Sequence, residues 1–214
     1  MKKGLLVSAL ACAFLMVAAQ AAGAATNAVC AGALGAGSYQ RVTVPAGAAC
    51  FSDGPVVISD GLYVGAGATF VLGSEENAVP TGWISGGVHA AGAASVQIHF
   101  STINGGVDIR GGAGPFGGPF GITWSTIEDS TINGRTTVAG YDGFWFGFIR
   151  NHVNGSVNLV GNVSTQDDDS NEVVSNTING GLACTANAPA PQVGDSAGST
   201  NKVTGRESGQ CAGL

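Results

Sequence analysis

A five-residue phrase, in which polar residues flank a central Ile or Val and Gly ends the run, is written five times in this chain. The copies are Ser101–Gly105, Ser130–Gly134, Asn151–Gly155, Asn176–Gly180 and Asn201–Gly205. Their apolar anchors are 29, 21, 25 and 25 residues apart: Ile103, Ile132, Val153, Ile178 and Val203. A period of about 20 to 30 residues, built on β-branched residues and Asn-Gly turns, predicts a solenoid of stacked coils. Most of the repeated residues are then committed to contacts between coils.

The residues around the phrases alternate between apolar and polar, which is the period of a β-strand. Outside the first 25 residues no window has the apolar spacing of a helix, so we predict an all-β fold. We expect a cap at residues 26–43, about seven coils over 44–205 and a second cap at 206–214. At about 4.8 Å per coil, the solenoid would be a rod near 30 Å long. The recurring Asn-Gly pairs are predicted to form corners within a coil rather than hairpins.

Two segments interrupt the period. Residues 111–122 are too rich in Gly and Pro for a central strand, and residues 166–172 are strongly acidic. Both are predicted to project as loops from one side of the solenoid.

The first 25 residues have the pattern of a secretion signal. Lys2 and Lys3 precede an apolar run from Leu5 to Ala19, and small residues follow with cleavage sites after Ala21 or Ala24. The run is too short for a stable membrane span, and no later stretch approaches the ~20 apolar residues that a span needs. We therefore predict a secreted protein, extracellular or associated with the cell surface, with no membrane span.

Four cysteines remain after the signal: Cys30, Cys50, Cys184 and Cys211. An even number in an exported chain favours disulfides, although four cysteines allow three pairings. Because the ends of a solenoid do not touch, Cys30–Cys50 and Cys184–Cys211 is the pairing that needs no long-range contact. Zinc is the alternative, but no Cys-x-x-Cys or nearby histidine pair supports it.

Charge limits the partners. Without Lys2 and Lys3 the chain has six basic and 14 acidic residues, which argues against nucleic acid and against anionic membranes as partners.

Aligning the phrases produces two polar columns. Asn104, Asn133, Asn154 and Asn179 share one column, which we interpret as a ladder of corner amides that bond to one another. The neighbouring column of Thr102, Thr131, His152, Thr177 and Lys202 is interpreted as ordinary strand surface rather than a flat ice-binding row.

Aromatic residues gather in and around residues 141–148, one coil after Phe116, Phe120 and Trp124. Alternation places Phe144, Phe146 and Phe148 on one strand face and Trp145 on the other. We interpret most of these rings as core, with Tyr141 and Trp145 as the candidates for an exposed binding surface.

The acidic segment offers oxygen atoms at alternate positions, from Asp167, Asp169 and Asn171. This spacing can wrap a calcium ion, but the glycine and the final glutamate of an EF-hand loop are absent. A solvated acidic loop is the competing interpretation. No other cofactor is predicted.

Acid–base chemistry on sugars needs two carboxylates that face one bond. The adjacent pairs Glu75-Glu76 and Glu128-Asp129 do not meet this need alone, because neighbours on a strand point to opposite faces. No serine, cysteine or histidine constellation for nucleophilic catalysis appears either. We predict no catalytic residues and no enzyme.

The C-terminal stretch has Asn176–Gly180 before Cys184, a Pro-Ala-Pro turn at 189–191, and Asn201–Gly205 before Gly209-Gln210-Cys211. This ending resembles that of uncharacterised secreted bacterial β-helix-repeat proteins, mostly actinobacterial, and the resemblance extends through the repeats. The resemblance implies a right-handed parallel β-helix, and it does not imply any particular activity.

We therefore expect a non-enzymatic binding or structural module at or near the bacterial cell envelope. Its partner would be cell-wall or other polysaccharide, or a surface protein. The first alternative is a polysaccharide-active enzyme, a lyase or hydrolase, recognisable by two carboxylates that face each other in a groove beside Trp145. The second is a self-assembling surface protein, against which the disulfide-linked ends argue.

Overall fold

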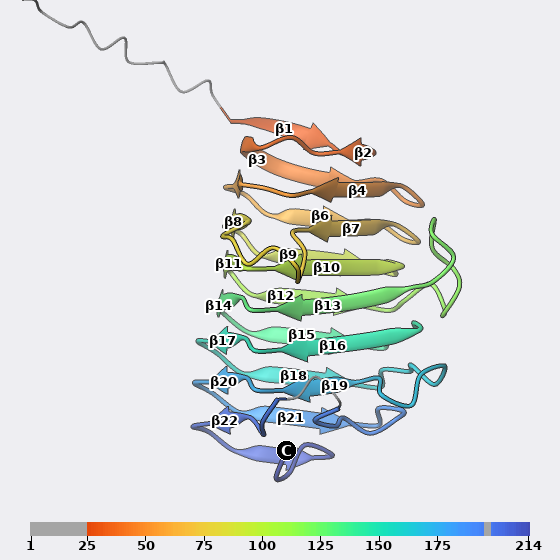
Figure 1. Cartoon of the computed structure of the whole chain (residues 1–214), viewed down its shortest axis with the longest axis vertical. Coiled ribbons are helices and arrows are strands. Elements are labelled where there is room, and N and C mark those ends of the chain that lie inside the picture. The colour runs from red at the N-terminus through yellow and green to blue at the C-terminus, as the bar shows by residue number, and fades with distance from the viewer. Residues whose placement is uncertain (1–24, 195–197) are drawn as a thin grey trace, which may run out of the picture.

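The computed structural model describes residues 25–194 and 198–214, and in these residues it contains β-strands and no helix. The strands stack level upon level from the N-terminal to the C-terminal end (Figure 1). The ladder pairings between them are parallel. The predicted β-solenoid is confirmed. The signal sequence predicted at residues 1–25 lies, apart from Ala25, outside the described residues, and none of the described segments is a helix that could cross a membrane.

Each coil contributes strands to three faces. The first face contains β5 (Val56–Ile58), β8 (Gly82–Ile84), β11 (Ser101–Asn104), β14 (Thr131–Asn133), β17 (His152–Val153), β20 (Thr177–Ile178) and β22 (Lys202–Val203). The second contains β6 (Leu62–Val64), β9 (Val88–Ala91), β12 (Val107–Arg110), β15 (Thr136–Ala139), β18 (Val157–Val160), β21 (Leu182–Thr185) and β23 (Glu207–Gly209). The third contains β2 (Gly32–Ala33), β4 (Ala49–Ser52), β7 (Thr69–Leu72), β10 (Ser95–His99), β13 (Trp124–Glu128), β16 (Trp145–Ile149) and β19 (Glu172–Val174).

The solenoid begins earlier than the sequence predicts. The long strand β3 (Gly37–Val44) pairs with β5 through its first half and with β6 through its second half. The strand β1 (Thr26–Val29) pairs with β3 in turn. The predicted cap at residues 26–43 is therefore already part of the sheets. Together with the second half of β3, the second face has eight levels where about seven were expected.

The repeated phrases occupy equivalent places in successive coils. Ile103 lies beside Ile132, and Val153 lies beside Ile178, in parallel register. These four anchors are fully buried, whereas Val203 at the last level is half-buried. The interior column predicted from the phrases is thus confirmed, and Phe146 and Phe148 fill the same interior from the third face.

The predicted asparagine ladder forms, but on the outside of the corner. The Nδ2 atom of Asn133 donates to Oδ1 of Asn104 at 2.7 Å, and Asn154 donates to Asn133 in the same way at 2.7 Å. Asn179 continues the ladder to Asn154 at 2.9 Å. Most of these side chains are exposed, so the ladder is a surface feature.

The buried ladder lies three residues earlier, in the column that begins each phrase. Asn151 Oδ1 accepts from the backbone N–H of Ser130, Asn176 Oδ1 from that of Asn151, and Asn201 Oδ1 from that of Asn176. All three amides are buried and also donate to backbone carbonyl oxygens. They satisfy backbone groups that the corner removes from the sheet ladders, which is the requirement for polar groups in an interior.

The two disulfides join Cys30 to Cys50 and Cys184 to Cys211, as predicted. Their Cα atoms are 5.5 and 5.3 Å apart, and all four cysteines are buried. Each bridge ties neighbouring levels at one end of the solenoid.

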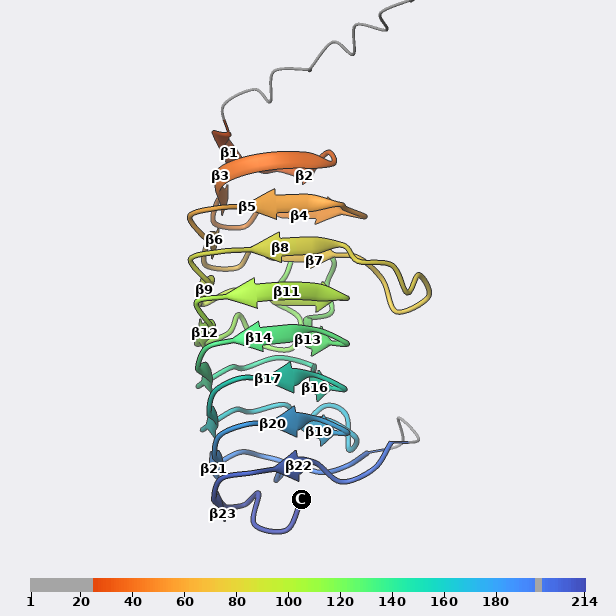
Figure 2. The same cartoon turned by 90° about the vertical axis from the view of Figure 1, so that its left-hand side faces the viewer.

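Both predicted insertions leave the coils as loops, together with a third. The 111–122 loop, drawn in green, projects from the edge of the stack in Figure 1. Its exposed Phe116 and Phe120 pack against Phe144 and Phe51, with ring centroids 5.9 and 6.2 Å apart. The third loop, residues 73–81 between β7 and β8, projects furthest in Figure 2.

Candidate functional site: a groove on the third face

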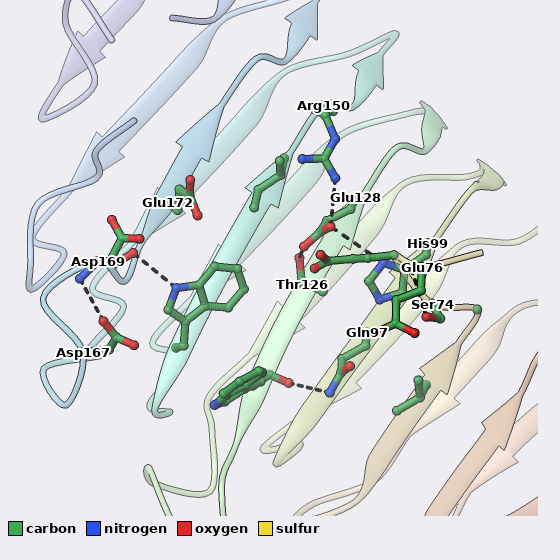
Figure 3. Close-up of a pocket in the computed structure, with 16 residues that line it drawn as sticks. Ser74, Glu76, Gln97, His99, Thr126, Glu128, Arg150, Asp167, Asp169 and Glu172 are labelled. Carbon is green, nitrogen blue, oxygen red and sulfur yellow. Dashed lines mark hydrogen bonds and ion pairs between the residues drawn. The ribbon is translucent and has the colours of Figure 1, made fainter. Parts of the chain in front are cut away.

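The outer surface of the third face is hollowed into a groove of about 730 Å³ (Figure 3). Its floor is formed by β7, β10, β13, β16 and β19, so it runs across the strands and along the solenoid axis. The start of the 73–81 loop lines one end, and the acidic loop lines the other end. Five strands about 4.8 Å apart give the groove a length of about 19 Å.

Strand alternation decides which side chains reach the groove. Along β13, Ser125 and Ile127 point into the core, while Trp124, Thr126 and Glu128 line the groove. Because the strands are parallel and in register, equivalent residues of neighbouring strands also point into the groove. Trp145 lies beside Trp124, Gln97 beside Thr126, and His99 beside Glu128.

Two tryptophans form the aromatic part of the floor. Trp124 is 50% exposed, Trp145 is half-buried, and their ring centroids are 6.5 Å apart. The Nε1 atom of Trp145 donates a hydrogen bond to the backbone oxygen of Asp169 at 3.2 Å. The acidic loop therefore fixes the orientation of this ring, which leaves a rigid aromatic surface beside polar side chains.

Glu128 lies at the other side of the floor and is only 1% exposed. Its Oε1 atom accepts a hydrogen bond from the Thr126 hydroxyl at 2.6 Å, and its Oε2 atom accepts one from Arg150 Nη2 at 3.2 Å. Arg150 also makes a two-pronged contact with Asp129, with both distances 2.8 Å. Figure 3 shows the carboxyl group of Glu128 between Arg150 and the ring of His99.

Burial sets the protonation of this cluster. It raises the pKa of Glu128 to about 7, helped by the charge of Glu75 and by a hydrogen bond with the Glu75 carboxyl group, and opposed by Thr126 and Arg150. Burial also lowers the pKa of His99, so this ring is neutral at pH 7. The 3.8 Å between His99 Nδ1 and Glu128 Oε2 is consequently a contact of a neutral ring, too long for a hydrogen bond.

Glu75 and Glu128 converge from different coils, one from each of the adjacent pairs that the sequence shows. They meet because the loop that begins at Gly73 carries Glu75 back over the end of β13. Glycosidases place their two carboxyl groups about 5 to 9.5 Å apart around the scissile bond. One oxygen atom of Glu75 and one of Glu128 lie within 4.8 Å of each other, at or just below the lower end of this range, so the pair is also placed to share a proton or a cation.

Of the two predicted binding residues, only Trp145 reaches the groove. Tyr141 is 1% exposed, and its hydroxyl group donates to the backbone oxygen of Thr123 at 3.1 Å. Burial raises its pKa to about 12. The expectation of an exposed Tyr141 is therefore wrong: the corner before β16 turns its ring inward, where it packs against Phe146 with centroids 5.9 Å apart.

The three residues of the predicted calcium loop are divided. Asp167 and Asp169 line the groove, and Asp167 Oδ1 accepts from the backbone N–H of Asp169 at 3.0 Å. Asn171 is buried, and its Nδ2 atom donates to the backbone oxygen of Pro189 at 2.8 Å. Calcium binding by this loop stays a prediction.

The sequence reasoning missed Trp124, His99, Glu128 and Arg150 as a constellation. The signal was present: extending the aligned phrases two residues backward places His99 above Glu128, and one residue backward places Phe100, Asp129 and Arg150 in one column. All three of the latter have positive φ, from 47° to 54°, which turns the chain sharply between the third and first faces. Glu75 lies in an irregular loop and no repeat predicts its position.

Comparisons with protein-family models, with curated proteins and with solved structures find no significant match to this chain.

Proposed function

We propose that this protein is a secreted binding module that holds an extracellular polysaccharide in the groove of its third face. The observation that carries the proposal is the pair Trp124 and Trp145, held side by side on a rigid sheet and open to solvent. Flat aromatic rings with polar neighbours suit the apolar faces and hydroxyl groups of sugars. The two disulfides and the signal-like residues 1–25 support a role outside the cytoplasm, at or near the bacterial cell envelope.

The charge of the groove narrows the class of polysaccharide. The side chains that line it include six acidic residues and a single arginine, whose guanidinium group is engaged by Glu128 and Asp129. A chain of uronic acids would be repelled by this surface, so a neutral or amino-sugar polymer is the expected ligand. Gln97, whose Nε2 atom donates to the Ser95 hydroxyl at 3.1 Å, places an amide at the centre of the floor for sugar hydroxyl groups.

The test is retention of the secreted chain on insoluble neutral, amino-sugar and acidic polysaccharides, with Trp124→Ala and Trp145→Ala as variants. Trp83→Ala is a matched control, because Trp83 is also 50% exposed but lies on the first face. We expect retention on neutral or amino-sugar polymers, a loss of at least tenfold in affinity for both groove variants, and no change for the control. Equal retention of all four proteins, or none on any polymer, would exclude the groove as a polysaccharide site.

Cleavage of the bound polymer is the second candidate function, since two carboxyl groups face each other in a groove that Trp145 also lines. The oxygen atoms of Glu75 and Glu128 come within 4.8 Å, near the short end of the glycosidase range, so this candidate is decided by product analysis. New reducing ends or unsaturated products released from a retained polymer, and absent with Glu128→Gln, would decide for an enzyme.

A further inference from the structure

Glu75, His99 and Glu128 bring together one ligand atom each, all within 4.8 Å of one another. They are the only group of His, Cys, Asp and Glu side chains in the described part of the chain that converges in this way. They come from three successive segments of the solenoid: the loop after β7, the end of β10 and the end of β13. We propose that these three side chains form a binding site for one divalent transition-metal ion such as Zn²⁺ or Mn²⁺.

The imidazole of His99 is the independent observation. Its side chain is 5% exposed, and its Nδ1 atom has no hydrogen-bond partner among the described residues. A buried imidazole nitrogen without a partner is uncommon, because an unpaired polar atom loses its hydrogen bonds to water on burial and gains none in return. Figure 3 shows the ring directed at the Glu128 carboxyl group. A neutral ring with its proton on Nε2 would offer Nδ1 to a metal.

The distances suit a shared ion. Two ligand atoms that each lie about 2.1 Å from a metal are about 3.4 Å apart in a tetrahedral site and about 4.2 Å apart when opposite one another. The 3.8 Å between His99 Nδ1 and Glu128 Oε2 falls in this interval. The three ligand atoms lie within 4.8 Å of one another, slightly more than a shared ion requires. Glu75 is exposed on its loop, so its carboxylate can move closer to the other two.

Charge and donor type agree with a cation of this class. With Asp129 neutralised by Arg150, two carboxyl groups remain beside the imidazole, and a divalent ion compensates both. Glu128 Oε2 accepts a hydrogen bond from Arg150, and its second lone pair stays available. One nitrogen and two oxygen ligands favour a first-row transition ion over Ca²⁺ or Mg²⁺, which prefer oxygen ligands alone.

The experiment is calorimetric titration of the EDTA-treated, secreted chain with Zn²⁺ and Mn²⁺, and with Ca²⁺ and Mg²⁺ for comparison. We expect one transition ion per chain, bound at least tenfold more tightly than Ca²⁺. Glu75→Gln and His99→Asn should each weaken binding at least tenfold. Because Glu75 is exposed, its variant tests the site even if the buried variant fails to fold. Cobalt absorption in the visible range, present in wild type and lost in Glu75→Gln, gives a second readout of the ligands.

The matched controls are Glu76→Gln, the next carboxylate on the same loop, and His152→Asn, an exposed histidine on the first face. Binding that survives Glu75→Gln and is lost in Asp167→Asn would overturn the proposal in favour of the acidic loop. Absence of one-to-one binding of either transition ion to wild type would also overturn it. Polysaccharide retention is measured without metal, so the two proposals fail separately.

Discussion

Replacing Glu128 by Gln should remove a penalty that the folded protein carries at neutral and alkaline pH. A carboxyl group whose pKa rises from 4.5 in the unfolded chain to about 7 in the fold prefers its protonated form when folded. Below pH 4.5 the group is protonated in both states and does not oppose folding. As the pH rises through 7 the folded protein must ionise a buried carboxyl group, and its free energy of unfolding falls. Each pKa unit corresponds to about 1.4 kcal/mol, so the loss is about 3 kcal/mol.

The variant keeps the geometry that this calculation assumes. A glutamine at position 128 retains an oxygen atom for the Thr126 hydroxyl, which bonds to Oε1 at 2.6 Å in the wild type. Its amide nitrogen would face the unpaired Nδ1 atom of His99. Arg150, with a side chain 40% exposed, keeps both bonds to Asp129 when it loses the bond to Glu128.

Urea denaturation of wild type and Glu128→Gln, followed by tryptophan fluorescence in EDTA from pH 4.5 to 8.5, measures the difference. We expect the free energy of unfolding of the variant, relative to that of wild type, to increase by about 3 kcal/mol between pH 4.5 and pH 8.5. For Glu76→Gln, an exposed change in the same groove, the free energy of unfolding should vary with pH as it does in wild type. Parallel curves for wild type and Glu128→Gln, together with a Glu128 carboxyl carbon that titrates near pH 4.5 by NMR, would refute the reasoning.

Three further outcomes test what holds the coils together. Asn176→Ala should cost about 3 kcal/mol in urea denaturation, because it leaves a buried N–H and a buried carbonyl unpaired, whereas Asn154→Ala on the exposed ladder should cost less than about 1 kcal/mol. Removing the Cys184–Cys211 bridge, which closes 27 residues, should cost about 3.5 kcal/mol and expose the last coils to proteolysis. Gly155→Ala should unfold the protein or lower its melting temperature sharply, because the new Cβ atom would lie 2.2 Å from a carbonyl oxygen of the preceding coil.

Features that recur in every coil could be predicted from the sequence. Ile103, Ile132, Val153 and Ile178 stack in the core because parallel register transfers one residue's environment to its equivalent in the next coil. The same logic placed the disulfides, since a solenoid brings only near neighbours together. It found the ladder of Asn104 and its equivalents but not the buried ladder three residues earlier, because a corner has an inner and an outer polar position and the phrase alone does not say which is inside.

By itself, the sequence determined the all-β class, the stacking of coils and the residues of the core, because each depends on a local period that repeats. Only the tertiary structure decided that Tyr141 faces inward, that Trp124 and Trp145 share one groove, and that Glu75 meets His99 and Glu128. The physical reason is that the site combines side chains from strands of different coils with side chains from loops that leave the repeat. The path of the loop after Gly73 depends on packing across several coils, and the burial that shifts the pKa of Glu128 exists only once those coils are stacked.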